Sequence, residues 1–433
     1  MMIAVLILVA LGILFIYSAE VNSAGVLVND KYTKQIVWAS VGFVLMILFT
    51  LYDYRKFEPL AFYFYIGLVV VLVLVPIFSQ TVKGAKSWIG IGRLGIQPSE
   101  FGKLIYILFL AKFLATSTNM KPIKRFIFAM IIMIVPMGLV LIQPDLGTAS
   151  VYIPIFLIMC FIAGVPLKYL LYITSFGILT ILFTLLPFWN DLIAEKPLAA
   201  IRILTDTKLC GLLIAALLVL GAIGLVARFY FHSPKYFEVI SYIFIIIAAS
   251  LISSFILAKF LLKGHDDPTE SYQLMRLISF MDPYIDPKNT GYHIIQSKIA
   301  IGAGGIVGKG FLRGTQSHLR FLPEQSTDFI FSILSEEMGF LGGCLVFALY
   351  LFILIKILYI TRKCTNKYGS YICAGVFAML VFHFLVNVGM VMGLMPITGI
   401  PLMFLSYGGS SMITAMCSIG VVMSINCRKT EFN

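Results

Sequence analysis

An acidic residue, Asp328, stands in the stretch RFLPEQSTDFIFSILSEEMGFLGG, residues 320–343, where an apolar run begins that continues past Tyr350. A carboxylate at the rim of a membrane costs free energy unless the protein uses it. A carboxylate within hydrogen-bond reach of a hydroxyl can act as a general base. A place before a helix favours the ionised form and partial loss of water favours the protonated form, and the residues leave that balance open.

Three further ionisable residues fall inside apolar runs, namely Glu336, Glu337 and His383. Ionisable side chains at membrane depth usually mark functional sites. They can equally form an internal hydrogen-bond network that holds helices together, and both interpretations stay open here.

A polar stretch, VKGAKSWIGIGRLGIQPSEFGKL, covers residues 82–104. Pro98 suits the first turn of a helix. Glu100 and Lys103 are three residues apart, so they can pair on one helix face. The pair is either a structural ion pair or part of a polar wall beside a substrate groove. Basic residues before it could meet phosphates: Lys83, Lys86 and Arg93.

The short segment QPDLGTA, residues 143–149, places Asp145 between two apolar runs. Such a sequence is a good turn, and Asp145 can cap the following helix. A contact with a cation or with substrate is the alternative.

Two glycine-rich segments interrupt the apolar pattern. The first, GAGGIVGKG at residues 302–310, lacks the features of a nucleotide-binding loop, although its backbone amides could hold a phosphate or a sugar. His293 and His318 nearby are interpreted as surface or packing residues. The second, GLMPITGIPLMFLSYGGSSM at residues 393–412, predicts broken backbone that is buried or lines a cavity.

The composition places the whole chain in the polytopic membrane class. It has 433 residues, of which 60% are hydrophobic and 12% charged, and its mean hydropathy is +0.99. The net charge of +12 is interpreted as a topology signal and predicts no nucleic-acid partner. The seven cysteines contain no CxxC pair and predict neither disulfides nor a metal site.

Twelve apolar runs predict twelve helices. Basic residues cluster in alternate connectors, which places those connectors and both termini in the cytoplasm. The connector at 263–328 is long and not of disordered composition, so short helices at the membrane surface are expected there. The runs cover residues 2–19, 36–52, 59–78, 101–118, 125–142, 149–165, 168–188, 209–231, 237–262, 329–360, 371–392 and 403–426.

Six segments together resemble the SEDS family (shape, elongation, division and sporulation), and one block is most similar to its elongation branch. The resemblance implies an all-α, polytopic helical bundle with ten core helices, in which residues 189–263 add an inserted helix pair. It implies one transmembrane domain over residues 1–433, with a large extracytoplasmic catalytic loop at 264–328. The segments are KGAKSWI, QPSEFGKL, QPDLGTA, GYHIIQSKIAIGAGGIVGKG, GTQSHLRFLPEQSTDFIFSILSEE and MPITGIPLMFLSYGGSS.

The activity that the resemblance implies is that of a peptidoglycan glycosyltransferase, which polymerises lipid II at the bacterial cytoplasmic (inner) membrane during elongation. Asp328 aligns with the family's catalytic carboxylate. Implied partners are a class B penicillin-binding protein and other elongation-complex proteins. A divalent cation, Mg²⁺ or Mn²⁺, is possible, and no organic cofactor is expected. Residues expected to bind substrate or support the site are Lys83, Lys86, Trp88, Gln97, Ser99, Glu100, Lys103, Asp145, Arg276, Gln296, Lys309, Glu324, Thr327 and Ser406.

Two residues depart from the family pattern: Ser326 replaces the usual histidine two residues before the catalytic aspartate, and Met403 replaces a proline. If that histidine tunes the aspartate, this chain must do so differently. A flippase for the same lipid is the competing hypothesis, because interrupted helices and buried acids suit a transporter. The crowding of polar motifs on the outer face favours an external catalyst, and a scaffold would leave those motifs unexplained.

Overall fold

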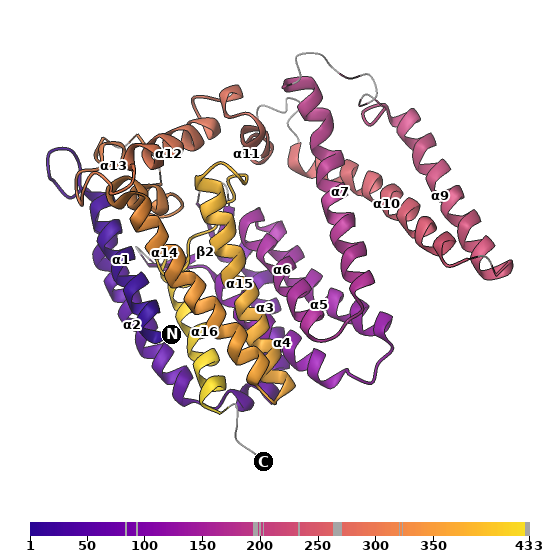
Figure 1. Ribbon diagram of the computed structural model, residues 1–433, viewed down its shortest axis with the longest axis horizontal. Coiled ribbons are helices and arrows are strands. Elements are labelled where there is room, and N and C mark those ends of the chain that lie inside the picture. Colours follow the sequence, from indigo (N-terminus) through magenta and orange to yellow (C-terminus); the bar gives the residue numbers. More distant parts are fainter. Residues whose placement is uncertain are drawn as a thin grey trace. The chain divides into compact units, whose positions relative to one another are not determined.

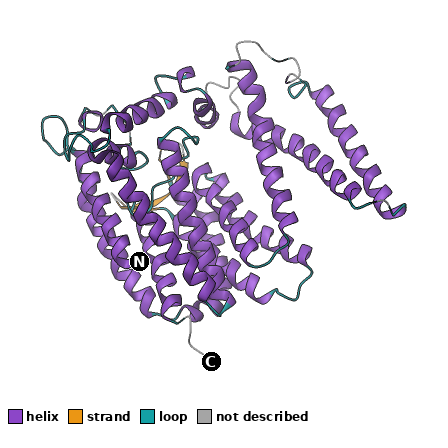
Figure 2. Cartoon of the chain, in the orientation of Figure 1, coloured by secondary structure: helices purple, strands orange, loops and turns teal. Residues whose placement is uncertain are grey.

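The computed structural model describes residues 1–82, 85–91, 94–193, 198, 201, 203–232, 234–262, 271–319, 321–322 and 324–428. Figure 2 shows that helices dominate these residues. The chain forms two compact units, one made of residues 1–166 and 296–433 and the other of residues 167–295.

The first unit is a helical bundle with a small sheet (Figure 1). Helix α16 packs on α2, α15 packs on α4, α6 and α14, and α1 packs on α14. The long helices of this unit are α1 (Met2–Glu20), α2 (Lys31–Leu51), α3 (Phe57–Phe78), α4 (Pro98–Thr116), α5 (Pro122–Ile142), α6 (Leu146–Ile162), α14 (Ile330–Lys363), α15 (Lys367–Val391) and α16 (Gly409–Cys427).

The second unit contains three long helices, α7 (Leu167–Leu192), α9 (Thr207–Tyr230) and α10 (Tyr236–Leu262). Helix α10 packs against both α7 and α9, and the short helix α11 (Tyr272–Met281) packs against α7 and α10. Helix α12 (Thr290–Gly304) begins in this unit and ends in the first.

The twelve predicted runs correspond to the twelve long helices. Among the described residues, ten of these helices are long and apolar enough to cross a membrane. Of the other two, α6 is apolar but has only 17 residues, and α4 contains Glu100, Lys103 and Lys112. The protein is therefore a multi-pass membrane protein. The long connector contains short helices as predicted, α11, α12 and α13 (Thr315–His318).

A three-stranded antiparallel sheet, which an all-α prediction does not include, precedes α4. Strands β1 (Gln80–Val82), β2 (Ala85–Ile91) and β3 (Leu94–Ile96) pair in that order. Pro98 then opens α4, as predicted, with Gln97 as its N-cap residue. The sheet therefore leads the chain directly into the helix that carries Glu100 and Lys103.

Helix α14 is broken at Gly339, whose φ of 63° and ψ of −159° are reached almost only by glycine. The break frees backbone groups that the glycine-rich segment satisfies: Phe340 N–H donates to the carbonyl of Gly305, and Leu341 N–H to that of Ile306. In the other direction, Lys309 N–H donates to the carbonyl of Glu336. The glycine-rich segment thus uses part of its backbone on α14, and a role of its other amides toward a phosphate or a sugar stays a prediction.

Candidate active site

Asp328 lies partly exposed in the turn that precedes α14. Its main-chain carbonyl accepts a hydrogen bond of 3.0 Å from the Asn387 side chain of α15. The carbonyl of Ser326 accepts from Tyr407 N–H at 2.8 Å. Residues 326–328, here called the Asp328 turn, are therefore held through their main chain by two other segments.

Lys31, at the start of α2, contacts the same turn. Its ammonium group lies 3.0 Å from the Ser326 hydroxyl and 3.4 Å from the Glu20 carboxylate, and 5.9 Å from the centre of the Tyr407 ring. Burial and then the charge of Glu20 raise the pKa of Tyr407 above its ordinary value, which keeps this phenol protonated at neutral pH. A cation thus stands beside the position where the family pattern has a histidine.

The connector at residues 393–408, which contains Tyr407, lies beside the same turn. Gln35 of α2 donates to the Ser406 carbonyl at 3.2 Å and accepts from Gly408 N–H at 3.2 Å. The Ser406 hydroxyl accepts from Leu402 N–H at 2.9 Å. The connector is therefore broken backbone packed against α2 and α15, as its glycines and prolines predict.

Glu100 and Lys103 form the predicted ion pair, with 2.6 Å between Lys103 Nζ and Glu100 Oε1, and both are buried. Lys103 Nζ also lies 3.1 Å from His383 Nε2, and His383 Nδ1 lies 2.9 Å from the Pro401 carbonyl. An ammonium only donates and a carbonyl only accepts, so His383 carries its proton on Nδ1 and is neutral. This arrangement supports the structural interpretation of the pair and the network interpretation of His383.

Asp145 caps α6, as the turn interpretation predicts, because its Oδ1 accepts from Thr148 N–H at 3.0 Å. Its Oδ2 accepts from the Gln97 side chain at 2.7 Å. Gln97 N–H donates to the Ser410 hydroxyl at 3.0 Å. Gln97 thus joins the start of α4 to the starts of α6 and α16.

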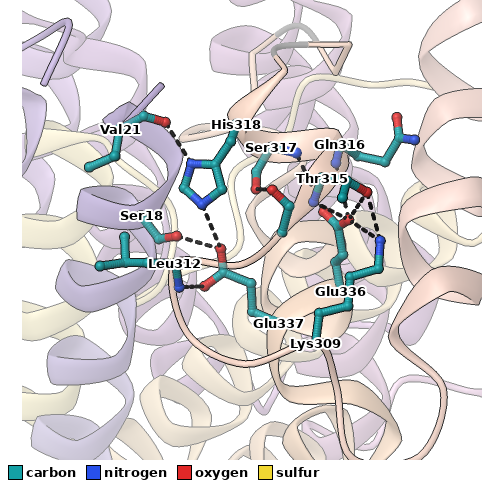
Figure 3. A network of polar contacts seen from close by, with 11 residues as sticks. Ser18, Val21, Lys309, Leu312, Thr315, Gln316, Ser317, His318, Glu336 and Glu337 are labelled. Carbon is teal, nitrogen blue, oxygen red and sulfur yellow. Dashed lines mark hydrogen bonds and ion pairs between the residues drawn. The ribbon is translucent and has the colours of Figure 1, made fainter. Parts of the chain in front are cut away.

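Figure 3 shows the network around Glu336 and Glu337. Both carboxylates are buried, and both accept hydrogen bonds from neighbouring residues. Glu336 Oε1 accepts from Lys309 Nζ at 2.9 Å and from Thr315 N–H at 2.7 Å. Glu337 accepts from the Ser18 hydroxyl and from Leu312 N–H. The two side chains therefore hold the 309–317 segment against α14 and α1.

His318 belongs to this network, so its interpretation as a mere surface or packing residue was incomplete. Its Nδ1 lies 2.8 Å from the Val21 carbonyl, and its Nε2 lies 3.8 Å from Glu337 Oε1. Lys309 also belongs to this network. Its ammonium group donates to Glu336 and, at 2.7 Å, to the Thr315 hydroxyl.

The remaining expected site residues are more scattered. Glu324 and Thr327 are neighbours within the segment before Asp328. Ser99 is buried at the start of α4, Trp88 is partly buried in β2, and Gln296 is partly buried in α12. Arg276 lies in α11, within the second unit. Lys83 and the side chain of Lys86 lie outside the described residues, as does Arg93.

Sequence reasoning did not select Lys31 or Asn387. Lys31 is one of two lysines in the first turn of α2, and its partner Ser326 is far away along the chain. Asn387 lies within an apolar run. Its amide side chain alone indicates that it contacts other segments, because a buried amide needs hydrogen-bond partners.

No three His, Cys, Asp or Glu side chains among the described residues come together as metal ligands. The Mg²⁺ or Mn²⁺ that the resemblance implies can be held by fewer side chains together with water and substrate phosphates, so it stays a prediction.

Comparison with known proteins agrees with the motifs. The family model of FtsW, RodA and SpoVE, described as cell cycle protein, matches residues 1–202 and 212–431. The chain belongs to this family. The resemblance to SEDS proteins is thereby confirmed. The insertion of residues 189–263 stays a prediction.

Two curated relatives of the family are similar over nearly the whole chain. Peptidoglycan glycosyltransferase RodA of Treponema pallidum is 48% identical, with 99% of this chain and 97% of that protein covered. Peptidoglycan glycosyltransferase MrdB of Escherichia coli K12 is 31% identical, with 99% of this chain and 93% of that protein covered.

Solved structures of family members share the fold. A chain of a peptidoglycan synthase complex, described for its coordination of polymerization and crosslinking, matches with a TM-score of 0.67 at 24% identity, covering 100% of this chain and 98% of its own. The rod shape determining protein RodA of Thermus thermophilus matches with a TM-score of 0.61 at 22% identity, covering 100% and 97%. The predicted helical membrane fold is confirmed.

Proposed function

We propose that this chain is a peptidoglycan glycosyltransferase that polymerises lipid II during cell elongation, with Asp328 as the general base. The relatives named for that activity support the reaction class. The observation that carries the residue assignment is the Asp328 turn. It holds a partly exposed carboxylate at the start of α14 by contacts from α2, α15 and the 393–408 connector.

The reaction joins two lipid-linked sugars. A hydroxyl of the acceptor attacks the anomeric carbon of the donor, a carbon–oxygen bond forms, and the bond to the lipid pyrophosphate breaks. Asp328 takes the proton of the attacking hydroxyl. Negative charge grows on the leaving pyrophosphate, and a cation nearby lowers the barrier. Lys31 offers such a charge beside the turn, where its side chain is 31% exposed.

A divalent cation, Mg²⁺ or Mn²⁺, stays a prediction, and no step above depends on one. The outward position of the turn also stays part of the proposal. Basic residues in the alternate connectors and after α16 support cytoplasmic termini in the bacterial inner membrane. With that orientation the start of α14 faces the side on which peptidoglycan is built.

A transpeptidase partner is the second part of the proposal. A structural neighbour is a complex that coordinates polymerization and crosslinking. We expect this chain to work with a class B penicillin-binding protein and with other proteins of the elongation complex.

The test is polymerisation of purified lipid II by the full chain with its partner, scored as glycan strands. Asp328→Asn keeps the side-chain shape but cannot take a proton at neutral pH, so we expect a loss of at least ~10²–10⁴ in rate. Folding and partner binding should be unchanged. Asp328→Glu should keep partial activity, with no change in its dependence on Mg²⁺ or Mn²⁺.

A folded Asp328→Asn protein that still makes long strands would contradict the base assignment. In that case transport of the lipid would become the better hypothesis.

A further inference from the structure

Helix α15 presents two buried polar side chains, His383 and Asn387, to the same connector. They are four residues apart and therefore share one helix face. Both have an exposed fraction of 0%. Asn387 Nδ2 donates to the Ile400 carbonyl at 2.8 Å, and His383 Nδ1 donates to the Pro401 carbonyl at 2.9 Å. Two successive carbonyls of the connector are thus fixed to one helix.

Asn387 makes a second bond that reaches the Asp328 turn. The same Nδ2 atom donates to the Asp328 carbonyl at 3.0 Å. An amide nitrogen has two hydrogens, so both are used on main-chain carbonyls. Its Oδ1 is buried and has no hydrogen-bond partner among the residues that the structure describes. Asn387 therefore acts as a double donor that joins the main chain of Asp328 to that of Ile400.

His383 extends this connection to the buried ion pair. Its Nε2 accepts from Lys103, which in turn donates to Glu100 at 2.6 Å. The groups form an unbroken polar path from α4 through α15 to the connector at 400–401, and from there through Asn387 to Asp328. Every side chain on the path before Asp328 is buried.

We propose that Asn387 is a positioning residue for Asp328, and that His383 couples the Glu100–Lys103 pair to the same stretch of backbone. This inference rests on the proposed function, because it assumes that Asp328 reacts. A general base works only within hydrogen-bond reach of the proton it takes. Loss of the anchor lets the turn shift, and a displacement of about 1 Å can cost on the order of 10²-fold in rate.

The first test compares two buried hydrogen bonds on α15. Asn387→Leu keeps the side-chain size and removes both donors. The matched control is Ser297→Ala. It removes a buried hydroxyl that donates to the Val391 carbonyl of α15 at 2.7 Å and lies 2.8 Å from the Ser332 hydroxyl of α14, and that has no hydrogen bond to the Asp328 turn. Both proteins are measured as the full chain with its partner, for kcat and KM with lipid II and for thermal unfolding.

We expect Asn387→Leu to lower kcat by about 10- to 100-fold with KM changed by less than about twofold. Ser297→Ala should keep kcat within about twofold of the parent. Asp328→Asn is measured in parallel. If it is inactive while folded Asn387→Leu has the kcat of Ser297→Ala, the positioning role is wrong and the base assignment stands. If Asp328→Asn is active, the base assignment itself falls.

A second pair of variants separates the two contacts of His383. It tests the coupling through the connector even if Asn387→Leu does not fold. His383→Asn can place an amide donor near the Nδ1 position and keep the bond to Pro401, while it loses Lys103. His383→Gln can keep an acceptor near the Nε2 position for Lys103, while it loses Pro401. Coupling through the connector predicts a higher kcat for His383→Asn than for His383→Gln, by about 10-fold. An equal kcat, or the reverse order, contradicts the coupling.

Discussion

Neighbouring segments contact different atoms of two acidic residues, Asp328 at the start of α14 and Glu336 two turns further along. Asp328 is partly exposed, and its turn is held by contacts with main-chain carbonyls and with Ser326. Glu336 is completely buried, and its carboxylate itself receives the bonds from Lys309 and from the backbone of residues 315–317. The contacts of Asp328 named here hold its main chain, whereas those of Glu336 hold its carboxylate.

This difference shows what an ionisable residue in a membrane helix can mean. Presence within an apolar run does not separate a reacting carboxylate from a structural one. The atoms that neighbours hold are the better guide, because a carboxylate saturated by donors stabilises whatever it binds. Substitutions in the two regions should therefore affect different quantities.

The largest effect on stability should come from Glu336→Ala. It leaves the Lys309 ammonium and several amides of residues 315–317 without their acceptor, and breaking a buried charged network in this way costs about 3 kcal/mol. Thermal unfolding in detergent measures the change. The control is Glu238→Ala, which removes a partly exposed partner of Arg228 at 3.7 Å and should cost less than about 1 kcal/mol.

The distinction between Asp328 and Glu336 would be wrong if Glu336→Ala left the unfolding temperature of the protein unchanged but abolished polymerisation. Glu336 would then belong with Asp328 as a reacting group. The same measurement on Asp328→Asn should give the opposite pattern, lost activity with unchanged unfolding.

Gly339→Ala should have the next largest effect, about 1–3 kcal/mol from backbone strain alone. A methyl group there would lie 2.4 Å from Gly308 N and 2.7 Å from the Ile306 carbonyl oxygen, so the glycine-rich segment must also move. The matched control lies four residues further in the same helix. At Gly343 the nearest atom, Phe331 Cζ, is 3.6 Å away, and alanine is the better helix former.

We expect Gly339→Ala to lower the unfolding temperature and Gly343→Ala to leave it equal or higher, measured in the same detergent. Equal stabilities of the two variants would mean that the break in α14 does not hold the glycine-rich segment.

The sequence predicted the long helices well because twenty apolar residues have few other stable arrangements in a membrane. It predicted the cap at Asp145 and the Glu100–Lys103 pair because both depend on residues close together in the chain. The sheet of β1, β2 and β3 was missed, since two of its strands have only three residues and are too short to show an alternating pattern.

Contacts between distant segments could not be predicted in the same way. The break at Gly339 is stabilised by residues 305–310, and the glycine within the apolar run of α14 does not show that this segment is its partner. The bonds of Asn387 to Asp328 and of Lys31 to Ser326 join segments brought together only by the complete bundle. The site was therefore predicted as a set of motifs, and its anchors required the structure.

The smallest expected effect concerns Lys31, and it tests the positioned side of the comparison. Lys31→Ala removes the contact with the Ser326 hydroxyl and the positive charge beside the turn, so we expect kcat for lipid II polymerisation to fall by about 10-fold. Stability should change by less than about 1 kcal/mol, because the pair with Glu20 is partly exposed.

Lys31→Arg keeps the charge and should retain most of the rate. Lys34→Ala is the control, since the Lys34 side chain lies one turn further in α2 and forms no hydrogen bond or ion pair with the described residues. If Lys31→Ala and Lys34→Ala have the same kcat, a cation at the place of the family's histidine has no role in the reaction. If Lys31→Ala instead unfolds the protein, Lys31 is an anchor like Glu336, and the distinction between the two regions does not hold.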